Sequence, residues 1–220
     1  MTVSAVSGSA TLSVNGKPVD LESLTAASMK SQSKTFFMAL TSDAIVKIPA
    51  NAWDDVPGDK MALINPNVVA AMSSAQVAVL DAEQLSGYTP AQIKNLGAAA
   101  DNYSASQFNT FKSTQVLALS AASLQALSPS KMVDLSGPFI RALNVAQIGQ
   151  LKPEQTVKLS LSQIGQLTPV QAKALEANDF AVWSDAQVDA LTDKLKADPE
   201  LHRKVVEVLS AESKAPGAQH

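Results

Sequence analysis

Large apolar residues recur every eight positions along most of the chain. One column begins at Ile64 and continues to Leu96, and after a step that is one residue short it resumes at Tyr103 and ends at Leu191. A second apolar column lies five residues after the first. Its members are Val69, Val77, Leu85, Ile93, Phe108, Val116, Leu124, Met132, Ile140, Ile148, Ile164, Phe180 and Val188. A period of this kind is typical of a repeat architecture in which each unit repeats one short structural motif.

Polar residues hold fixed places between the apolar ones. The residue after each member of the first column is mostly Ser, Thr, Asn or Asp, and Gln commonly stands three residues later, as in Ser73 and Gln76. This spacing is typical of a capping box, in which the hydroxyl and the Gln side chain satisfy free N–H groups of a helix start. Proline follows the cap directly at Pro66, Pro90, Pro129, Pro153 and Pro169, which is the first helical position. Each octad is therefore expected to begin a new helix.

The same pattern excludes two simpler structures. In one continuous helix, eight residues leave the apolar stripe about 80° out of register at each repeat, and the regularly placed prolines would break the hydrogen bonding. A β-solenoid needs a period of two, whereas the apolar columns alternate between spacings of five and three. We therefore predict a mainly α protein, built as a compact solenoid of very short helices with an eight-residue period.

The length of each helix determines how the octads must pack. Helices of about five or six residues are unstable alone, so both apolar columns must face an interior that successive units share. We expect this spiral to occupy residues 64–190, with three or four octads in each superhelical turn. The Gln column could be mistaken for a binding ladder, and we interpret it as explained fully by capping.

The two ends differ from the repeat. Residues 1–63 are expected to form a separate region, with a hairpin at Asn15-Gly16, one longer helix from Asp20 to about Leu40 and a short strand at 44–48. Residues 191–220 are richer in charge, and we expect them to form a C-terminal capping helix that starts near Asp198, followed by a disordered tail.

The composition of the chain argues against several classes of function. The chain is 46% hydrophobic and 17% charged with a net charge of −3, which argues against a disordered acidic segment and against a general nucleic-acid binder. Cysteine is absent, so disulfides, thiolate nucleophiles and cysteine metal sites are excluded. Residues 1–14 lack the pattern of a Sec signal peptide, and no apolar run has transmembrane length. The expected location is the cytoplasm or, after export without a Sec signal, the outside of the cell.

Candidate chemistry is sparse. Asp54, Asp55 and Asp59 lie near Trp53, but we interpret them as a solvated loop because no second acid or base motif supports a catalytic pair. His202 is the only histidine before the last residue of the chain, and a single histidine at a helix start is more often a surface residue than a metal ligand. We therefore expect no catalytic residues, no cofactor, no metal and no small-molecule substrate.

The places where the repeat fails are the better candidates for a functional role. Phe139 stands where Gln belongs, Thr156 interrupts the second apolar column, and Glu176 and Asp179 replace the usual cap and Gln. Because local exceptions to a pattern often mark function, we take these four residues and Trp53 as candidate interaction residues. The alternative interpretation of each exception is a tolerated irregularity or a bend in the spiral.

The strings of the form Thr-Pro-x-Gln-(Ile/Val)-x-x-Leu-(Ser/Thr) resemble the octapeptide helical repeats found in tandem in large bacterial secreted and surface proteins. The resemblance covers residues 64–190 and implies a repeat fold without a fixed catalytic site. It favours a non-enzymatic bacterial scaffold or protein-interaction module whose partner is another protein or a second copy of itself.

One alternative is a secreted effector or toxin that acts on a host cell or membrane. It rests on the uncharged, Ser/Thr-rich N-terminus, which resembles type III export leaders, and on the mean hydropathy of +0.06. Membrane contact is expected only under this alternative. An enzyme built on the N-terminal region is a third interpretation.

Overall fold

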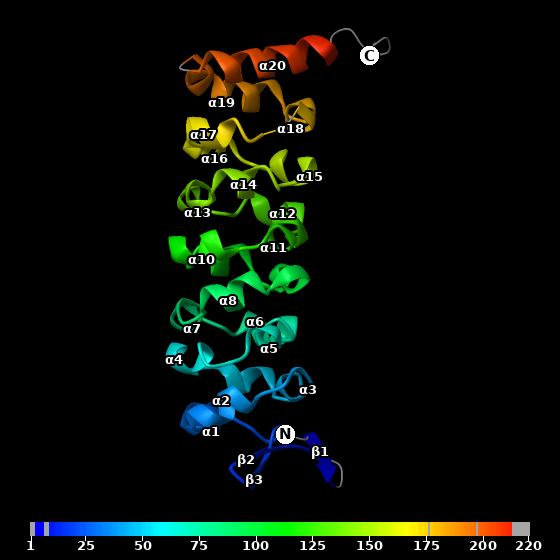
Figure 1. Cartoon of the computed structure of the whole chain (residues 1–220), viewed down its shortest axis with the longest axis vertical. Helices are drawn as coiled ribbons and strands as arrows, with labels where there is room; N and C mark the ends of the chain where they lie inside the picture. Colours follow the sequence, from blue (N-terminus) through cyan, green and yellow to red (C-terminus); the bar gives the residue numbers. More distant parts are fainter. Residues whose placement is uncertain (1–2, 7–8, 176, 197, 213–220) are drawn as a thin grey trace. The chain divides into compact units, whose positions relative to one another are not determined.

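The computed structural model describes residues 3–6, 9–175, 177–196 and 198–212. The chain divides into two compact units, Met1–Ala126 and Leu127–His220, and each is described by itself. Both units consist mainly of short helices that follow one another in a spiral (Figure 1). The predicted fold class, a solenoid of very short helices, is confirmed.

A small antiparallel sheet begins the first unit. Its strands β1 (Val3–Val6), β2 (Ser9–Val14) and β3 (Lys17–Asp20) are arranged in the order β1-β2-β3. The turn between β2 and β3 is the predicted one, since Asn15 and Gly16 have φ values of 52° and 79°, the left-handed conformation that a two-residue hairpin turn requires. The hairpin is confirmed, and β1 extends it to three strands.

The helices of the first unit begin at intervals of eight residues. They are α1 (Ala26–Ser31), α2 (Lys34–Ala39), α3 (Ser42–Ile45), η1 (Ala50–Trp53), α4 (Gly58–Met61), α5 (Pro66–Val69), α6 (Ser74–Ala78), α7 (Ala82–Ser86), α8 (Pro90–Lys94), η2 (Gly97–Asn102), α9 (Ala105–Phe108), α10 (Ser113–Ala118) and α11 (Ala121–Ala126). The interval is seven only between α8 and η2, where the sequence pattern is one residue short.

Two local predictions for the N-terminal region are wrong. The single helix expected from Asp20 to Leu40 is two helices, because Thr25 and Ser33 each accept a hydrogen bond from the backbone N–H three residues later and so begin separate helices. The strand expected at 44–48 is instead the end of α3 and a turn, because Thr41 caps that helix in the same way. The eight-residue spacing of helix starts therefore reaches back to Ala26.

The second unit continues with the same spacing. Its helices are α12 (Pro129–Met132), α13 (Gly137–Ala142), α14 (Val145–Ile148), α15 (Pro153–Thr156), α16 (Leu161–Gln166), α17 (Pro169–Ala172), α18 (Ala177–Ala181), α19 (Asp185–Lys196) and α20 (Pro199–Glu212). The last two are longer than the repeat helices. α20 starts at the predicted place and buries Val205, whereas residues 213–220, where a tail was expected, lie outside the described residues.

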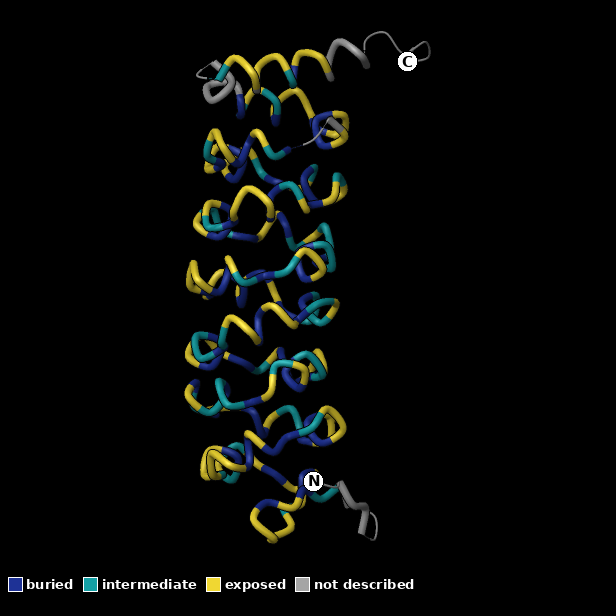
Figure 2. The backbone as a smooth tube through the Cα atoms, viewed as in Figure 1, coloured by how far each residue is buried: buried dark blue, intermediate teal, exposed yellow. Residues whose placement is uncertain are grey.

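The predicted capping boxes form in both units. In α8, the Thr89 hydroxyl accepts from the Gln92 backbone N–H at 3.3 Å, and Gln92 Oε1 accepts from the Thr89 backbone N–H at 2.7 Å. The same reciprocal pair forms at Ser73, Asp81, Ser104, Asn144, Ser160, Thr168 and Ser184. Both apolar columns are buried except at Val188, which is half-buried. Figure 2 shows buried segments along the inside of each turn and exposed ones on its outside.

The Gln side chains have a second role that capping does not explain. Gln92 Nε2 donates to the backbone carbonyls of Met61 and Ile64, both at 2.8 Å, which lie 31 and 28 residues earlier in the chain. Those carbonyls lie at the end of α4 and just after it, where a helix has no internal donors for its last C=O groups. Each Gln thus caps its own helix with Oε1 and ties it to an earlier helix with Nε2. The interpretation of the Gln column as capping alone is wrong.

This hydrogen bond recurs in both units and defines the superhelical turn. Equivalent bonds run from Gln76, Gln84, Gln107 and Gln115 in the first unit and from Gln155, Gln163, Gln171 and Gln187 in the second. Each reaches the end of the helix four repeats earlier, while helices three repeats apart, such as α4 and α7 or α13 and α16, are in contact. One turn therefore holds between three and four octads.

The first four helices lack this donor, and the elements described before them are the three strands of the sheet. The residues at the Gln position of α1, α2, α3 and η1 are Ser28, Phe36, Ala44 and Ala52. The donor begins at α4 with Lys60, whose ammonium donates to the carbonyls of Lys30 at 2.5 Å and Gln32 at 2.8 Å. Lys204 of α20 does the same for the carbonyls of Lys173 and Leu175. A lysine can therefore replace glutamine as the link between turns.

Candidate functional site

The sequence-predicted interaction residues lie inside the units. Trp53, Phe139, Thr156 and Asp179 are all buried, with exposed fractions between 0% and 4%, and Glu176 lies outside the described residues. A buried side chain cannot contact a partner unless the fold opens, so these four positions belong to the interior rather than to an interaction surface. The fold accommodates each of these four residues in its interior.

Thr156 and Asp179 are two buried polar exceptions to the repeat that form a hydrogen bond with each other. The Thr156 hydroxyl donates to Asp179 Oδ1 at 3.0 Å, and it also lies 3.2 Å from the carbonyl oxygen of Pro153. Asp179 occupies the Gln position of α18, and Thr156 occupies the apolar column of α15, two helices that are in contact. A carboxylate has no N–H to offer, so a hydroxyl in the neighbouring helix supplies the hydrogen bond that a buried polar group requires.

Trp53 and Phe139 fill the interior in different ways. Trp53 belongs to a buried apolar column of the first unit that also contains Met29, Phe37, Ile45 and Met61 at eight-residue spacing. Its backbone carbonyl accepts from Gln84 Nε2 at 2.5 Å. Phe139, in contrast, replaces a Gln with apolar volume, and its backbone N–H donates to the Ser136 cap at 3.2 Å.

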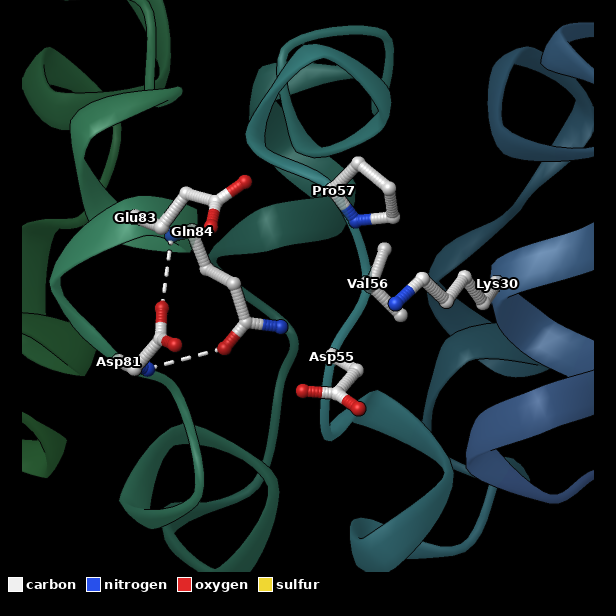
Figure 3. A pocket seen from close by; sticks show the side chains of 7 residues that line it. All are labelled: Lys30, Asp55, Val56, Pro57, Asp81, Glu83 and Gln84. Carbon is white, nitrogen blue, oxygen red and sulfur yellow. Dashed lines mark hydrogen bonds between the residues drawn. The ribbon is translucent and has the colours of Figure 1, made fainter.

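Of the three acidic residues near Trp53, only Asp55 lines a small pocket of about 100 Å³, and Asp54 and Asp59 do not (Figure 3). Asp55, Glu83 and Lys30 border it, together with Asp81, whose carboxylate accepts from the Gln84 backbone N–H at 3.0 Å. One carboxylate is thus committed to a helix cap. The pocket is smaller than the roughly 300–1,000 Å³ typical of ligand sites, and its acids are exposed. It offers no arrangement of an acid, a base and a nucleophile.

A buried tyrosine pair lies near the seven-residue step. Tyr103 Oη donates to Tyr88 Oη at 3.1 Å, and Tyr88 Oη in turn lies 3.8 Å from Met72 Sδ. The two rings meet edge to face with centroids 6.2 Å apart. Burial in the apolar interior raises the pKa of both phenols above their ordinary value. These hydroxyls are therefore neutral hydrogen-bonding groups of the core.

A wider groove lies on the surface of the first unit between α8 and α10. It has a volume of about 450 Å³ and is mostly apolar, with Leu117 and Lys94 on its exposed rim. Its full lining is Pro90, Ala91, Lys94, Leu117, Ala118, Leu119 and Ser120. Sequence reasoning missed this site, although Leu117 stands at a position where most other octads carry a small or polar residue; Met38, Val46, Val133 and Val157 are the other large apolar residues there.

The described residues hold little else that could act chemically. Within them, no group of three or more His, Asp or Glu side chains is placed to hold a metal ion, and His202 is exposed. Among the residues that the structure describes, no helix has the length and apolar character that crossing a membrane requires. No protein-family model matches the chain, and no curated protein matches it.

Proposed function

We propose that the chain is a non-enzymatic scaffold or protein-interaction module. The observation that supports this most is the use of its polar side chains. The Ser, Thr and Gln residues of the repeat cap helices and join turns, so their hydroxyl and amide groups already form structural hydrogen bonds. What remains variable is the exposed surface, and solenoids use such surfaces to bind other proteins.

Exposed apolar residues add to this support. Met38, Leu117, Val133, Leu161 and Val170 are 49–64% exposed, although the buried columns of the repeat do not require them. Large apolar side chains in water are favourable sites for contact with a partner, because binding removes their surface from water. A partner protein or a second copy of the chain fits this surface.

The proposal is tested with the full chain immobilised as bait in an extract of its source cells, with cross-linking and an excess of untagged chain as competitor. Specific partners are displaced by the competitor, whereas adventitious proteins are not. Sedimentation of the purified chain at several concentrations tests self-association. A strictly monomeric chain with no displaceable partner would contradict the proposal.

The exported effector is the second candidate and stays a prediction. Deletion of residues 1–15, followed by a secretion assay, separates it from the scaffold, because an export leader is necessary for secretion. Unchanged export of the shortened chain counts against the effector. A liposome-leakage assay tests membrane action, with no release of contents as the contrary result.

A further inference from the structure

Leu117 is a large apolar residue at a position where the fold needs none. It is the fifth residue of α10 and is 49% exposed. The equivalent residues of α6, α7 and α8 are Ala78, Ser86 and Lys94, which are small or polar. Because Leu117 belongs to neither buried column, the stability of the solenoid does not explain its size or its apolar character.

The groove beside Leu117 is shaped to receive a side chain. Ala91 and Ala118 are small residues that leave it open, while Pro90 and Leu119 add apolar wall. Its volume of about 450 Å³ lies within the roughly 300–1,000 Å³ range of ligand sites. A large aliphatic side chain placed here would remove its own surface and that of Leu117 from water.

The charge on the groove is positive and comes from Lys94. Lys94 is the only charged residue among the lining residues, and it forms no ion pair with any residue that the structure describes. No carboxylate lines the groove. A partner that carries a carboxylate next to its apolar side chain would complement Lys94, whereas a basic partner would be repelled.

The groove coincides with the irregular step of the repeat. α8 and α10 contact each other and start 23 residues apart, at 90 and 113, whereas the regular pair α5 and α8 starts 24 residues apart, at 66 and 90. The missing residue therefore offsets α10 against α8 by one position relative to the regular pairs. The pair α6 and η2, which start at 74 and 97, spans the same missing residue, so α8 and α10 are one of the pairs in the first unit whose stacking departs from the period.

We propose that the groove between α8 and α10 binds an acidic segment of a protein partner, with a large aliphatic side chain beside Leu117 and a carboxylate beside Lys94. This inference rests on the proposed function as an interaction module and names the chemistry of the partner. A second copy of the chain is one outcome of the test, and sedimentation of the wild-type protein identifies it.

The experiment measures fluorescence anisotropy of a labelled synthetic helical peptide, with Leu and Glu four residues apart, titrated with the full chain. Two further peptides replace every Glu by Lys or every Leu by Ser. The variants Leu117→Ser and Lys94→Glu change the groove, and Met38→Ser, at a residue that is 64% exposed in α2, is the matched control. Circular dichroism and urea unfolding establish that all three variants fold like the wild type.

The expected result is saturable binding of the Leu/Glu peptide that weakens at least about tenfold in Leu117→Ser and in Lys94→Glu but is unchanged in Met38→Ser. The Lys94→Glu variant is expected to bind the Leu/Lys peptide better than the wild type does. Equal binding to all variants, or none up to about 1 mM, overturns the groove proposal while the interaction function stands. Loss of the function itself is recognised separately, by the absence of any displaceable partner and of self-association.

Discussion

Replacing Gln92 with glutamate changes an amide into a carboxyl group and leaves the length of the side chain unchanged. The Oε1 atom can still accept from the Thr89 backbone N–H at 2.7 Å, so the cap of α8 is retained. The Nε2 donor is lost, and an oxygen then faces the carbonyls of Met61 and Ile64 in its place. The substitution therefore separates the link between turns from capping.

The magnitude follows from burial. Gln92 has an exposed fraction of 0%, so a carboxylate at this position would be an uncompensated buried charge beside two carbonyl oxygens. An unsatisfied buried acceptor costs about 1–3 kcal/mol, and a buried charge without a partner costs about 3–5 kcal/mol. We expect Gln92→Glu to lower the free energy of unfolding by about 3–5 kcal/mol at pH 7.

The loss depends on pH in a defined direction. Burial raises the pKa of the new carboxyl above the value of about 4.3 expected in the unfolded chain. The neutral acid is favoured in the folded state, so the deficit is full above the raised pKa and shrinks as the pH falls toward about 4. A protonated carboxyl also regains one donor for the carbonyls. A Gln92→Met variant, which cannot titrate, should show a smaller deficit that does not change with pH relative to the wild type.

Urea unfolding measured by tryptophan fluorescence tests this prediction. The chain has two tryptophans, Trp53 in the first unit and Trp183 in the second, so replacing one by Phe isolates the signal of the other. The transition reported by Trp53 should shift in Gln92→Glu. Gln166→Glu, at an exposed position of the second unit, is the control, and the transition reported by Trp183 should shift little in that variant. Equal stability of the Gln92→Glu and Gln166→Glu variants would refute the role of the amide.

Three further predictions concern other contacts of the first unit. Gly87→Ala should lower the free energy of unfolding by about 2–3 kcal/mol in a thermal unfolding experiment, because a Cβ at this position would lie 2.1 Å from the backbone oxygen of Gly58. The control is Gly165→Ala, where a Cβ would have no neighbour within 4 Å, and this variant should be as stable as the wild type or more stable. The raised pKa values of Tyr88 and Tyr103 keep both phenols neutral in the folded chain, so alkaline titration at 295 nm should show no phenolate until the chain unfolds. The free energy of unfolding should fall above about pH 10, where tyrosines of the unfolded chain ionise. A normal tyrosine titration of the folded protein would contradict their burial. Lys60→Met should lower the free energy of unfolding by about 1–3 kcal/mol and Lys60→Gln by less, as chemical denaturation would measure, and equal losses would argue against its role as a donor.

The octad and its caps could be predicted because both depend only on residues that are close together in the sequence. A capping box involves residues three apart, and the apolar columns repeat at a constant interval, so neither requires knowledge of distant contacts. The linking role of Gln92 was not predictable in this way, because its partners lie 28 and 31 residues away and the spacing of turns is a property of the folded spiral.

The first octads were missed for a related reason. The Gln that identifies the later repeats is absent from the first four helices, before which the structure describes strands and no helix end. Proline replaces the hydroxyl cap at Pro49 and Pro57. A short apolar run such as 44–48 is also ambiguous between a strand and part of a helix. The eight-residue recurrence of Met29, Phe37 and Ile45 would have resolved the ambiguity.

Four of the five candidate residues, Trp53, Phe139, Thr156 and Asp179, lie in the interior. An exception to a pattern shows where a repeat changes, and it does not show which side of the structure changes. Thr156 and Asp179 are exceptions that compensate each other inside the fold. Leu117 is an exception on the outside, with an exposed fraction of 49%. Sorting interior exceptions from exterior ones needed the three-dimensional arrangement.

The link between turns is tested most directly by nuclear magnetic resonance of the Gln92 side-chain amide in the full chain. Nuclear Overhauser contacts from its Nε2 protons to the backbone of Met61 and Ile64, with slow exchange of those protons with water, are the expected result. Rapid exchange and contacts confined to residues 89–93 would contradict a solenoid held together by glutamine.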